Sequence, residues 1–162
     1  MSRRRKNVQL PVIGWREDVR LPDLEIDAIK VKIDTGARTS AIHAFDVAVE
    51  LHRGAKCVTF EVHPEQRTAR GTVSVEADVV DERWITSSTG HRQMRYVVLM
   101  DVELAGVRWT SEVTLARRDQ MGFRMLLGRE ALRDRFLVDP SASFLGRRTI
   151  RTAAPARRTP TP

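Results

Sequence analysis

Asp34 is the residue best placed to do chemistry, because it stands where a predicted strand meets a tight turn. In residues 27–33 apolar residues alternate with lysines, which predicts a strand with one face in the core. Gly36 lets the backbone turn sharply and leaves its amide open to a substrate. Thr35 and Thr39 supply hydroxyls beside the carboxylate. This arrangement predicts a carboxylate that activates water.

The same tripeptide, Asp-Thr-Gly, also occurs as an ordinary turn, in which Asp bonds its own downstream amides and Gly takes a positive φ. A second motif favours the catalytic interpretation. Residues 125–132 read Met-Leu-Leu-Gly-Arg-Glu-Ala-Leu, an apolar run closed by Gly128 and Arg129 about ninety residues downstream of Asp34.

Together the two motifs resemble those of the retropepsin-like aspartic peptidases, with a long hairpin between them. The resemblance covers roughly residues 10–146. The flanking text, Gly-Trp-Arg-Glu at residues 14–17 and residues 118–129, is similar to the bacterial group labelled "ATP-dependent zinc proteases". Members of that group are often associated with RimK-type glutamate ligases. The label itself says nothing about use of zinc or ATP.

The resemblance implies an all-β, retropepsin-like acid-protease barrel with one short helix near the C-terminal end of the domain. The predicted catalytic residues are Asp34, Thr35 and Gly36. The predicted substrate-binding residues are Lys32, Ala37, Arg38, Thr39 and, at the tip of the hairpin, Gly90 and His91. Gly128 and Arg129 are expected to be structural.

Aspartic peptidases need two carboxylates, one as general base and one protonated to polarise the carbonyl. The sequence holds no second Asp-Thr-Gly, so a homodimer that contributes Asp34 twice across a twofold axis is the leading expectation. Retroviral relatives carry an acid after Asp-Thr-Gly-Ala that pairs with the Arg of Gly-Arg. Here Arg38 follows instead, so Arg129 must find another partner.

Alternation and turn residues predict a succession of short strands. The expected strands are 8–15, the one ending at Asp34, 40–51, 56–63, 73–80, a long hairpin over 81–100 and a second over 102–115, followed by a helix over 129–135 and a strand over 136–138. Residues 16–24 are expected to be a polar connection, punctuated by Pro22.

A chain of 162 residues with 41% hydrophobic content suits one domain. The expected organisation is a disordered basic arm at 1–7, a retropepsin-like domain at 8–146 and a disordered Arg/Pro/Ala-rich tail at 147–162. The nine cations of the two ends exceed the net charge of +7, which leaves −2 for the remainder. Nucleic acid is therefore expected to bind, if at all, only through these tails.

Cys57 is the only cysteine, so an intramolecular disulfide is impossible. No secretory signal precedes the domain, and the apolar run at 96–100 is far shorter than the ~20 residues that span a bilayer. A cytoplasmic protein without a membrane segment is expected. Four scattered histidines without a His-Glu-x-x-His motif predict no metal, and the absence of a Gly-rich phosphate loop predicts no cofactor.

The sequence thus predicts a peptidase that hydrolyses peptide or isopeptide bonds and trims glutamate-rich tails added by RimK-type ligases. Lys30, Lys32 and Arg38 beside Asp34 are expected to attract the acidic substrate, for which ribosomal proteins are candidates. Two alternatives remain open: a non-catalytic module that binds acidic tails through the same cleft, and a basic-tailed RNA or ribosome adaptor.

Overall fold

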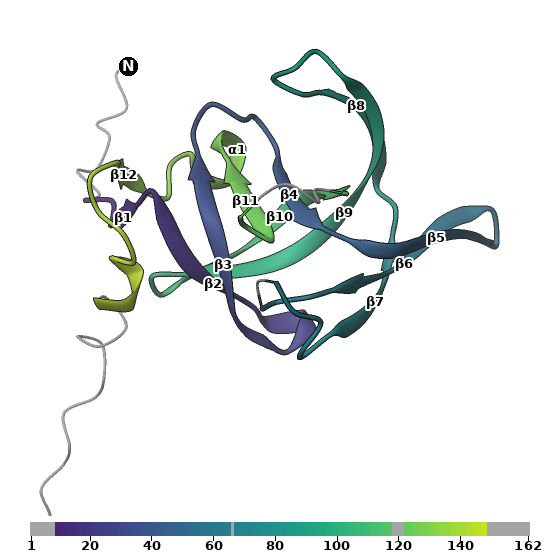
Figure 1. Cartoon of the computed structure of the whole chain (residues 1–162), viewed down its shortest axis with the longest axis horizontal. Coiled ribbons are helices and arrows are strands. Elements are labelled where there is room, and N and C mark those ends of the chain that lie inside the picture. Colours follow the sequence, from purple (N-terminus) through teal and green to yellow (C-terminus); the bar gives the residue numbers. More distant parts are fainter. Residues whose placement is uncertain (1–8, 66, 118–121, 149–162) are drawn as a thin grey trace, which may run out of the picture.

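Strands dominate the chain, which a computed structural model describes at residues 9–65, 67–117 and 122–148 (Figure 1). The predicted arm at 1–7 and residues 149–162 of the predicted tail lie outside these ranges. The strands are β1 (Val12–Gly14), β2 (Arg16–Leu21), β3 (Ile26–Asp34), β4 (Ser40–His43), β5 (Phe45–His52), β6 (Ala55–Val62), β7 (Val73–Asp78), β8 (Asp81–Thr86), β9 (Arg92–Leu104), β10 (Val107–Ala116), β11 (Met125–Gly128) and β12 (Leu137–Asp139). The helices are α1 (Arg129–Leu132) and a 3-10 turn, η1 (Pro22–Leu24). The all-β prediction is confirmed.

A closed ring of strands forms the centre of the molecule. The main sheet runs in the order β10-β4-β11-β3-β2-β9-β8, and β10 also pairs with β9, so six strands close on themselves and β8 extends the sheet. In this ring β3 lies between β2, which is antiparallel to it, and β11, which is parallel to it. The parallel register sets Gly128 beside Asp34, so the two motifs meet at one end of the ring.

The predicted core face of β3 is confirmed. Ile29, Val31 and Ile33 are buried, while Lys30 and Lys32 between them are half-exposed. The inward side chains of β3 join one apolar cluster with residues of most other strands. This burial fixes the strand that carries Asp34.

The prediction of a polar connection over 16–24 was wrong, because residues 16–21 form strand β2. Val19 and Leu21 face the core, and the next inward position, Glu17, is fully buried. Its Oε1 accepts hydrogen bonds from the amides of Gly14 at 2.7 Å and Leu145 at 2.8 Å, and its Oε2 accepts one from Gly146 at 3.2 Å. The strand was missed because a carboxylate occupies an inward position, which breaks the alternation of apolar and polar residues by which strands are predicted.

The prediction of one strand over 40–51 was also wrong, because the chain leaves the ring at Ala44. β4 pairs with β10 and β11, whereas β5 pairs with β6 in a separate sheet of order β5-β6-β7. Asp46 has a φ of 50°, and the register shifts between Phe45 and Ala48. The second sheet extends away from the ring, on the right of Figure 1.

The remaining elements are of the predicted type, although some are shorter than predicted. β8 and β9 form the expected long hairpin, which curves over one side of the ring (Figure 1). The helix predicted over 129–135 is shorter, because α1 spans only Arg129–Leu132. The expected early strand is reduced to β1, which pairs in parallel with β12.

Candidate functional site

Asp34 is the last residue of β3, and its carboxylate points toward the backbone of the turn that follows it. Its Oδ1 accepts hydrogen bonds from the amides of Gly36 at 3.1 Å and Ala37 at 3.2 Å. Within the described residues Oδ2 has no hydrogen bond, and the residue is half-exposed. One oxygen is therefore held by backbone donors, while the other can receive a water molecule or a second carboxyl group.

Gly36 takes part in this turn through its amide, which donates to Oδ1 of Asp34. Its φ lies outside the left-handed region, so it is not needed for a positive φ. A Cβ at this position would stand 3.4 Å from Oδ1 of Asp34. This is an ordinary contact distance, so the position has room for a small side chain, and the amide expected to stay open to a substrate is engaged by Asp34.

Gly128 brings β11 against the turn at very short range. A Cβ here would lie 2.6 Å from the carbonyl carbon of Thr39 and 3.0 Å from the carbonyl oxygen of Ala37. The Gly128 amide donates to Oγ of Ser40 at 3.0 Å, and the Arg129 amide donates to the Ala37 carbonyl at 2.7 Å. Only a residue without a side chain permits these contacts, so the structural role predicted for Gly128 has a physical basis.

Arg129 has the partner that the sequence left undetermined. Its Nη1 donates to the Thr35 carbonyl at 3.1 Å. The next amide, that of Glu130, donates to the Arg38 carbonyl at 3.1 Å. Residues at the start of α1 thus bond successive carbonyls of the turn, which fixes the loop that follows Asp34.

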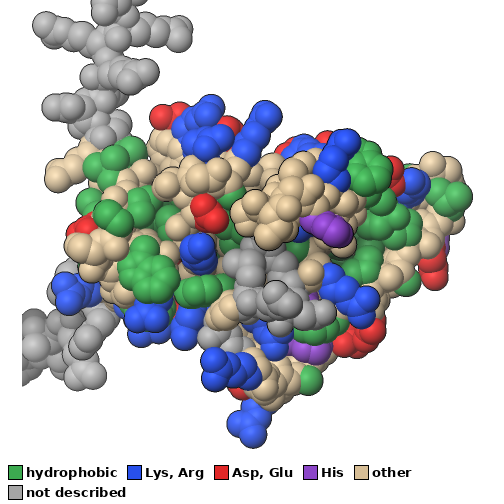
Figure 2. Space-filling model, turned by 45° about the horizontal axis from the view of Figure 1, so that its top comes forward, with side chains coloured by type: hydrophobic (Ala, Val, Ile, Leu, Met, Phe, Trp, Pro, Cys, Tyr) green, Lys and Arg blue, Asp and Glu red, His purple; other side chains and the backbone are tan. Residues whose placement is uncertain are grey.

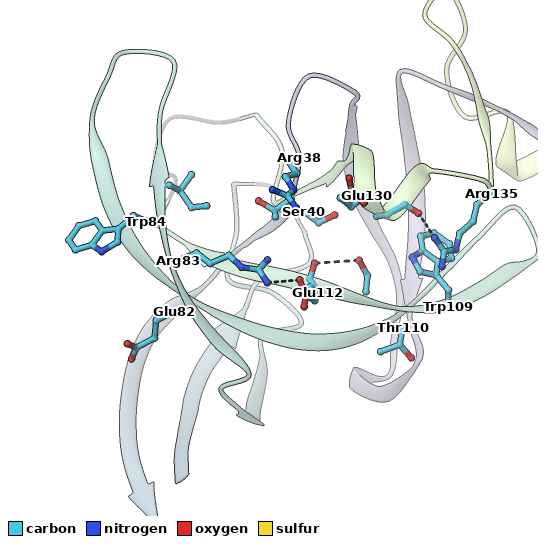
Figure 3. Close-up of a pocket in the computed structure, with 14 residues that line it drawn as sticks. Arg38, Ser40, Glu82, Arg83, Trp84, Trp109, Thr110, Glu112, Glu130 and Arg135 are labelled. Atoms are coloured by element: carbon cyan, nitrogen blue, oxygen red, sulfur yellow. Dashed lines mark hydrogen bonds and ion pairs between the residues drawn. The ribbon is translucent and has the colours of Figure 1, made fainter. Parts of the chain in front are cut away.

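A cavity of about 770 Å³ opens beside this loop (Figure 3). Its walls come from the loop after β3, from β8, from β10 and from α1 with the residues that follow it. The lining residues are Arg38, Thr39, Ser40, Glu82, Arg83, Trp84, Ile85, Trp109, Thr110, Ser111, Glu112, Glu130, Ala131 and Arg135. Asp34 does not line it, so the cavity begins four positions further along the chain, at Arg38.

Charges in the cavity are largely paired. Arg83 donates to Asp81 at 2.7 Å and lies 2.8 Å from Glu112, and these carboxylates raise the pKa of its guanidinium, Glu112 most strongly. Arg135 packs over the Trp109 ring, with its Cζ 5.3 Å from the centroid. The guanidinium of Arg38 makes no hydrogen bond or ion pair within the described residues, and the residue is exposed. It is therefore available to an incoming carboxylate.

The predicted substrate-binding residues are not all gathered here. Arg38 and Thr39 line the cavity, and Ala37 joins it to Asp34 through its backbone. Lys32 lies on the same face of β3 as Asp34 but does not line the cavity, and the hairpin contributes Glu82–Ile85 rather than its tip. The tip is closed on itself by a hydrogen bond from the Ser87 amide to the His91 carbonyl at 2.8 Å, and Gly90 adopts a φ of 83°. Roles for Lys32, Gly90 and His91 stay predictions.

Sequence reasoning missed most of the lining, including Arg83, Glu112 and Arg135. No pattern along the chain says which elements close around Trp109. These residues come from strands and a helix that are distant in sequence, and only the pairing of the strands brings them together.

The described residues contain no group of three or more His, Cys, Asp or Glu side chains that could hold a metal ion. The thiol of Cys57 is half-buried and 3.5 Å from Oε1 of Glu76, and burial followed by this hydrogen bond raises its pKa. A raised pKa disfavours the reactive thiolate. No helix of the described residues is long and apolar enough to cross a membrane.

Comparison with known proteins adds the family context. The family model described as "Retropepsin-like aspartic endopeptidase RimB" matches residues 12–149. A probable alpha-L-glutamate ligase of Shewanella pealeana is 46% identical over 133 residues, which are 82% of this chain and 29% of the ligase. A probable alpha-L-glutamate ligase of Desulfotalea psychrophila is 41% identical over 136 residues, or 84% of this chain and 29% of the ligase. The chain therefore corresponds to less than a third of these relatives.

A solved structure shares the architecture. The crystal structure of Lpg0085, a protein of unknown function from Legionella pneumophila, superposes with a TM-score of 0.69 at 28% sequence identity. The match covers 84% of this chain and 98% of that one.

Proposed function

Because the chain belongs to the RimB-like family of retropepsin-like aspartic endopeptidases, we propose that it hydrolyses peptide or isopeptide bonds with Asp34 as the reacting carboxylate. The observation that carries the proposal is the presentation of Asp34. Backbone amides hold one of its oxygens and leave the other accessible, and the bonds from Gly128, Arg129 and Glu130 fix the surrounding loop. Such preorganisation is what a water-activating carboxylate requires.

The mechanism needs a second carboxyl group, which a homodimer supplies. An ionised Asp34 takes a proton from the attacking water while the partner's Asp34, protonated, donates a hydrogen bond to the scissile carbonyl. The water oxygen bonds to the carbonyl carbon, and the departing nitrogen takes up a proton as its bond to carbon breaks. The accessible Oδ2 of Asp34 is the oxygen that would face the partner.

The proposed substrates are glutamate-rich tails of proteins, among them tails on ribosomal proteins. Two observations support this choice. The relatives named as probable alpha-L-glutamate ligases contain a stretch similar to this chain, which supports a substrate connected with glutamate ligation. Arg38 then offers an uncompensated guanidinium at the cavity next to Asp34, suited to a carboxylate side chain.

Asp34→Asn tests the reaction. The change is nearly isosteric and removes the ionisable acid, so we expect cleavage of glutamate-tailed peptides to fall to background while the chain stays folded. Digests of glutamate-tailed and ordinary peptides, read by mass spectrometry, measure the effect. Equal turnover by wild type and variant would refute Asp34 as the reacting group.

The second candidate function is a non-catalytic module that binds acidic tails. The free guanidinium of Arg38 favours this as much as it favours a peptidase. If the chain is such a binding module, wild type and Asp34→Asn bind glutamate-tailed peptides with the same affinity and neither cuts them. Binding without cleavage by the wild type would therefore select the module over the enzyme.

A further inference from the structure

Two of the cations that line the cavity beside the turn of Asp34 have no acidic partner. The charged lining residues are Arg38, Arg83, Arg135, Glu82, Glu112 and Glu130. Each glutamate is paired with a neighbouring cation, in the pairs Glu82–Lys56, Glu112–Arg83 and Glu130–Arg133. Arg38 and Arg135 form no ion pair within the described residues. These two guanidinium groups are therefore the ones that can receive an anion in the cavity.

The guanidinium of Arg135 is held in place without an acid. Its Cζ lies 5.3 Å from the centroid of the Trp109 ring, and that ring packs against Phe136 with the centroids 5.6 Å apart. Its Nη1 donates long hydrogen bonds to the carbonyls of Ala131 at 3.4 Å and Arg133 at 3.5 Å. Both bonds come from Nη1, so Nε and Nη2 have no acceptor within the described residues. Arg135 is thus positioned by the ring and the backbone, and it keeps donors for a ligand.

The indole of Trp109 supplies another unused donor next to this guanidinium. Trp109 lines the cavity and is 9% exposed, and its Nε1 is buried without a hydrogen-bond partner within the described residues. A buried N–H group without an acceptor destabilises a fold, and such groups are rare. An acceptor brought by a ligand would relieve this cost.

We propose that Arg135 and Trp109 form a carboxylate-binding subsite separate from Arg38, so that one cavity takes two carboxylates of its substrate. Guanidinium and indole groups only donate, and an ionised carboxylate only accepts, which makes the two complementary. In Figure 3 Arg38 and Arg135 lie on either side of Glu130, with Arg135 next to Trp109. The inference rests on the proposed function, which gives Arg38 one carboxylate of a glutamate-rich tail, and it adds the requirement for a second.

The second carboxylate has two sources in such a tail. It belongs either to another glutamate side chain or to the α-carboxylate at the end of the tail. A side chain would let the cavity hold an interior stretch of the tail, whereas an α-carboxylate would place the free end of the tail in the cavity. The chemistry of recognition is the same in both cases.

Peptide binding by the full chain carrying Asp34→Asn tests the proposal, because affinity is then measured without cleavage. The probes are fluorescein-labelled Ser/Gly peptides with an amidated C-terminus that carry one glutamate, or two glutamates separated by zero to three residues. We expect one spacing to bind about tenfold more tightly than the single glutamate in fluorescence anisotropy. Adding Arg135→Gln should abolish this gain and leave the affinity for the single-glutamate peptide nearly unchanged.

Single-glutamate peptides with a free C-terminus distinguish the two sources. If the α-carboxylate fills the subsite, the gain appears with the free end, disappears on amidation and again depends on Arg135. If a side chain fills it, the gain appears only in the amidated peptides with two glutamates. Either result supports the subsite.

Trp109→Phe keeps a ring beneath Arg135 and removes the N–H group, so it should reduce the gain several-fold. Arg20→Gln is the control, since the side chain of Arg20 is 48% exposed, pairs with Glu103 at 3.2 Å and does not line the cavity. It should keep the whole gain. Thermal unfolding checks each fold, and Arg135→Gln keeps the test decisive should Trp109→Phe unfold, because Arg135 lies outside the apolar core.

Two results would overturn the subsite. One is that no peptide with two carboxylates binds more tightly than the single-glutamate amide, and the other is that the gain survives Arg135→Gln. Failure of the proposed peptidase has a different signature. A wild-type chain that cuts no peptide, while the gain still depends on Arg135, would remove the catalytic role and leave the subsite in place.

Discussion

Gly128 decides how closely the second motif approaches the turn of Asp34. Its missing side chain lets three consecutive amides, those of residues 128–130, reach Ser40, Ala37 and Arg38. The turn after Asp34 is consequently held from two sides, by the carboxylate of Asp34 and by the start of α1. The glycine shapes the turn without contributing a chemical group of its own.

Gly128→Ala should destabilise the fold and displace the turn. The new Cβ would meet backbone at 2.6 Å, which side-chain rotation cannot relieve. Overpacking of this kind costs about 1–3 kcal/mol. Urea unfolding measures the loss, and cleavage should fall with it. Gly122→Ala is the control, because nothing lies within 4 Å of its Cβ position. Equal stability of the two variants would contradict the close approach.

Arg38→Glu should separate substrate binding from scaffold effects. If Arg38 receives a substrate carboxylate, the KM for glutamate-rich peptides should rise about tenfold, roughly 1.4 kcal/mol, and the KM for neutral peptides should change little. Arg53→Glu, on the exposed turn between β5 and β6, is the control. Equal losses on both peptides would instead give Arg38 a structural role.

Among the elements, β2 depends on a buried carboxylate as well as on apolar packing. Glu17 accepts three amide hydrogen bonds from segments on either side of it, residues 14 and 145–146. It therefore joins β1 and the last described turn to the ring.

Glu17→Gln should lower the free energy of unfolding by about 1–3 kcal/mol, because the new NH₂ group cannot accept from the amides that face it. Urea unfolding of the variant measures this, with Glu65→Gln at an exposed loop position as the control. An unchanged midpoint would mean that water satisfies these amides when the carboxylate is lost.

Sequence patterns predicted elements where side chains alternate and missed them where one position breaks the rule. The alternation of β3 and the hairpins over 81–100 and 102–115 were predicted because their inward residues are apolar. β2 was missed because Glu17 occupies an inward position, and the break between β4 and β5 was missed because it depends on which strands pair. The turn of Asp34 was predicted, but the cavity beside it was not, since its walls meet only in three dimensions.

For the whole molecule, the proposed mechanism makes activity depend on assembly, because each chain brings one Asp34. Light scattering across a dilution series should show a species of about twice 18.4 kDa, with activity falling as it dissociates. The Asp34→Asn chain should form the same dimer, which separates assembly from chemistry. A strictly monomeric chain with full activity would refute the shared pair of carboxylates.

The bonds of Glu17 also constrain when the protein can fold during its synthesis. A growing chain that ends before Leu145 lacks two of the three amides that this carboxylate needs, and one that ends before Leu137 lacks the whole of the strand that pairs with β1. Until those residues have been made, the earlier strands carry an unpaired carboxylate at an inward position. Burying this charge without its hydrogen bonds is unfavourable, so the ring of strands is not expected to close earlier. Folding of the domain is therefore expected to finish only after residue 146 has left the ribosome. A series of arrested chains of increasing length should become resistant to protease abruptly at that point.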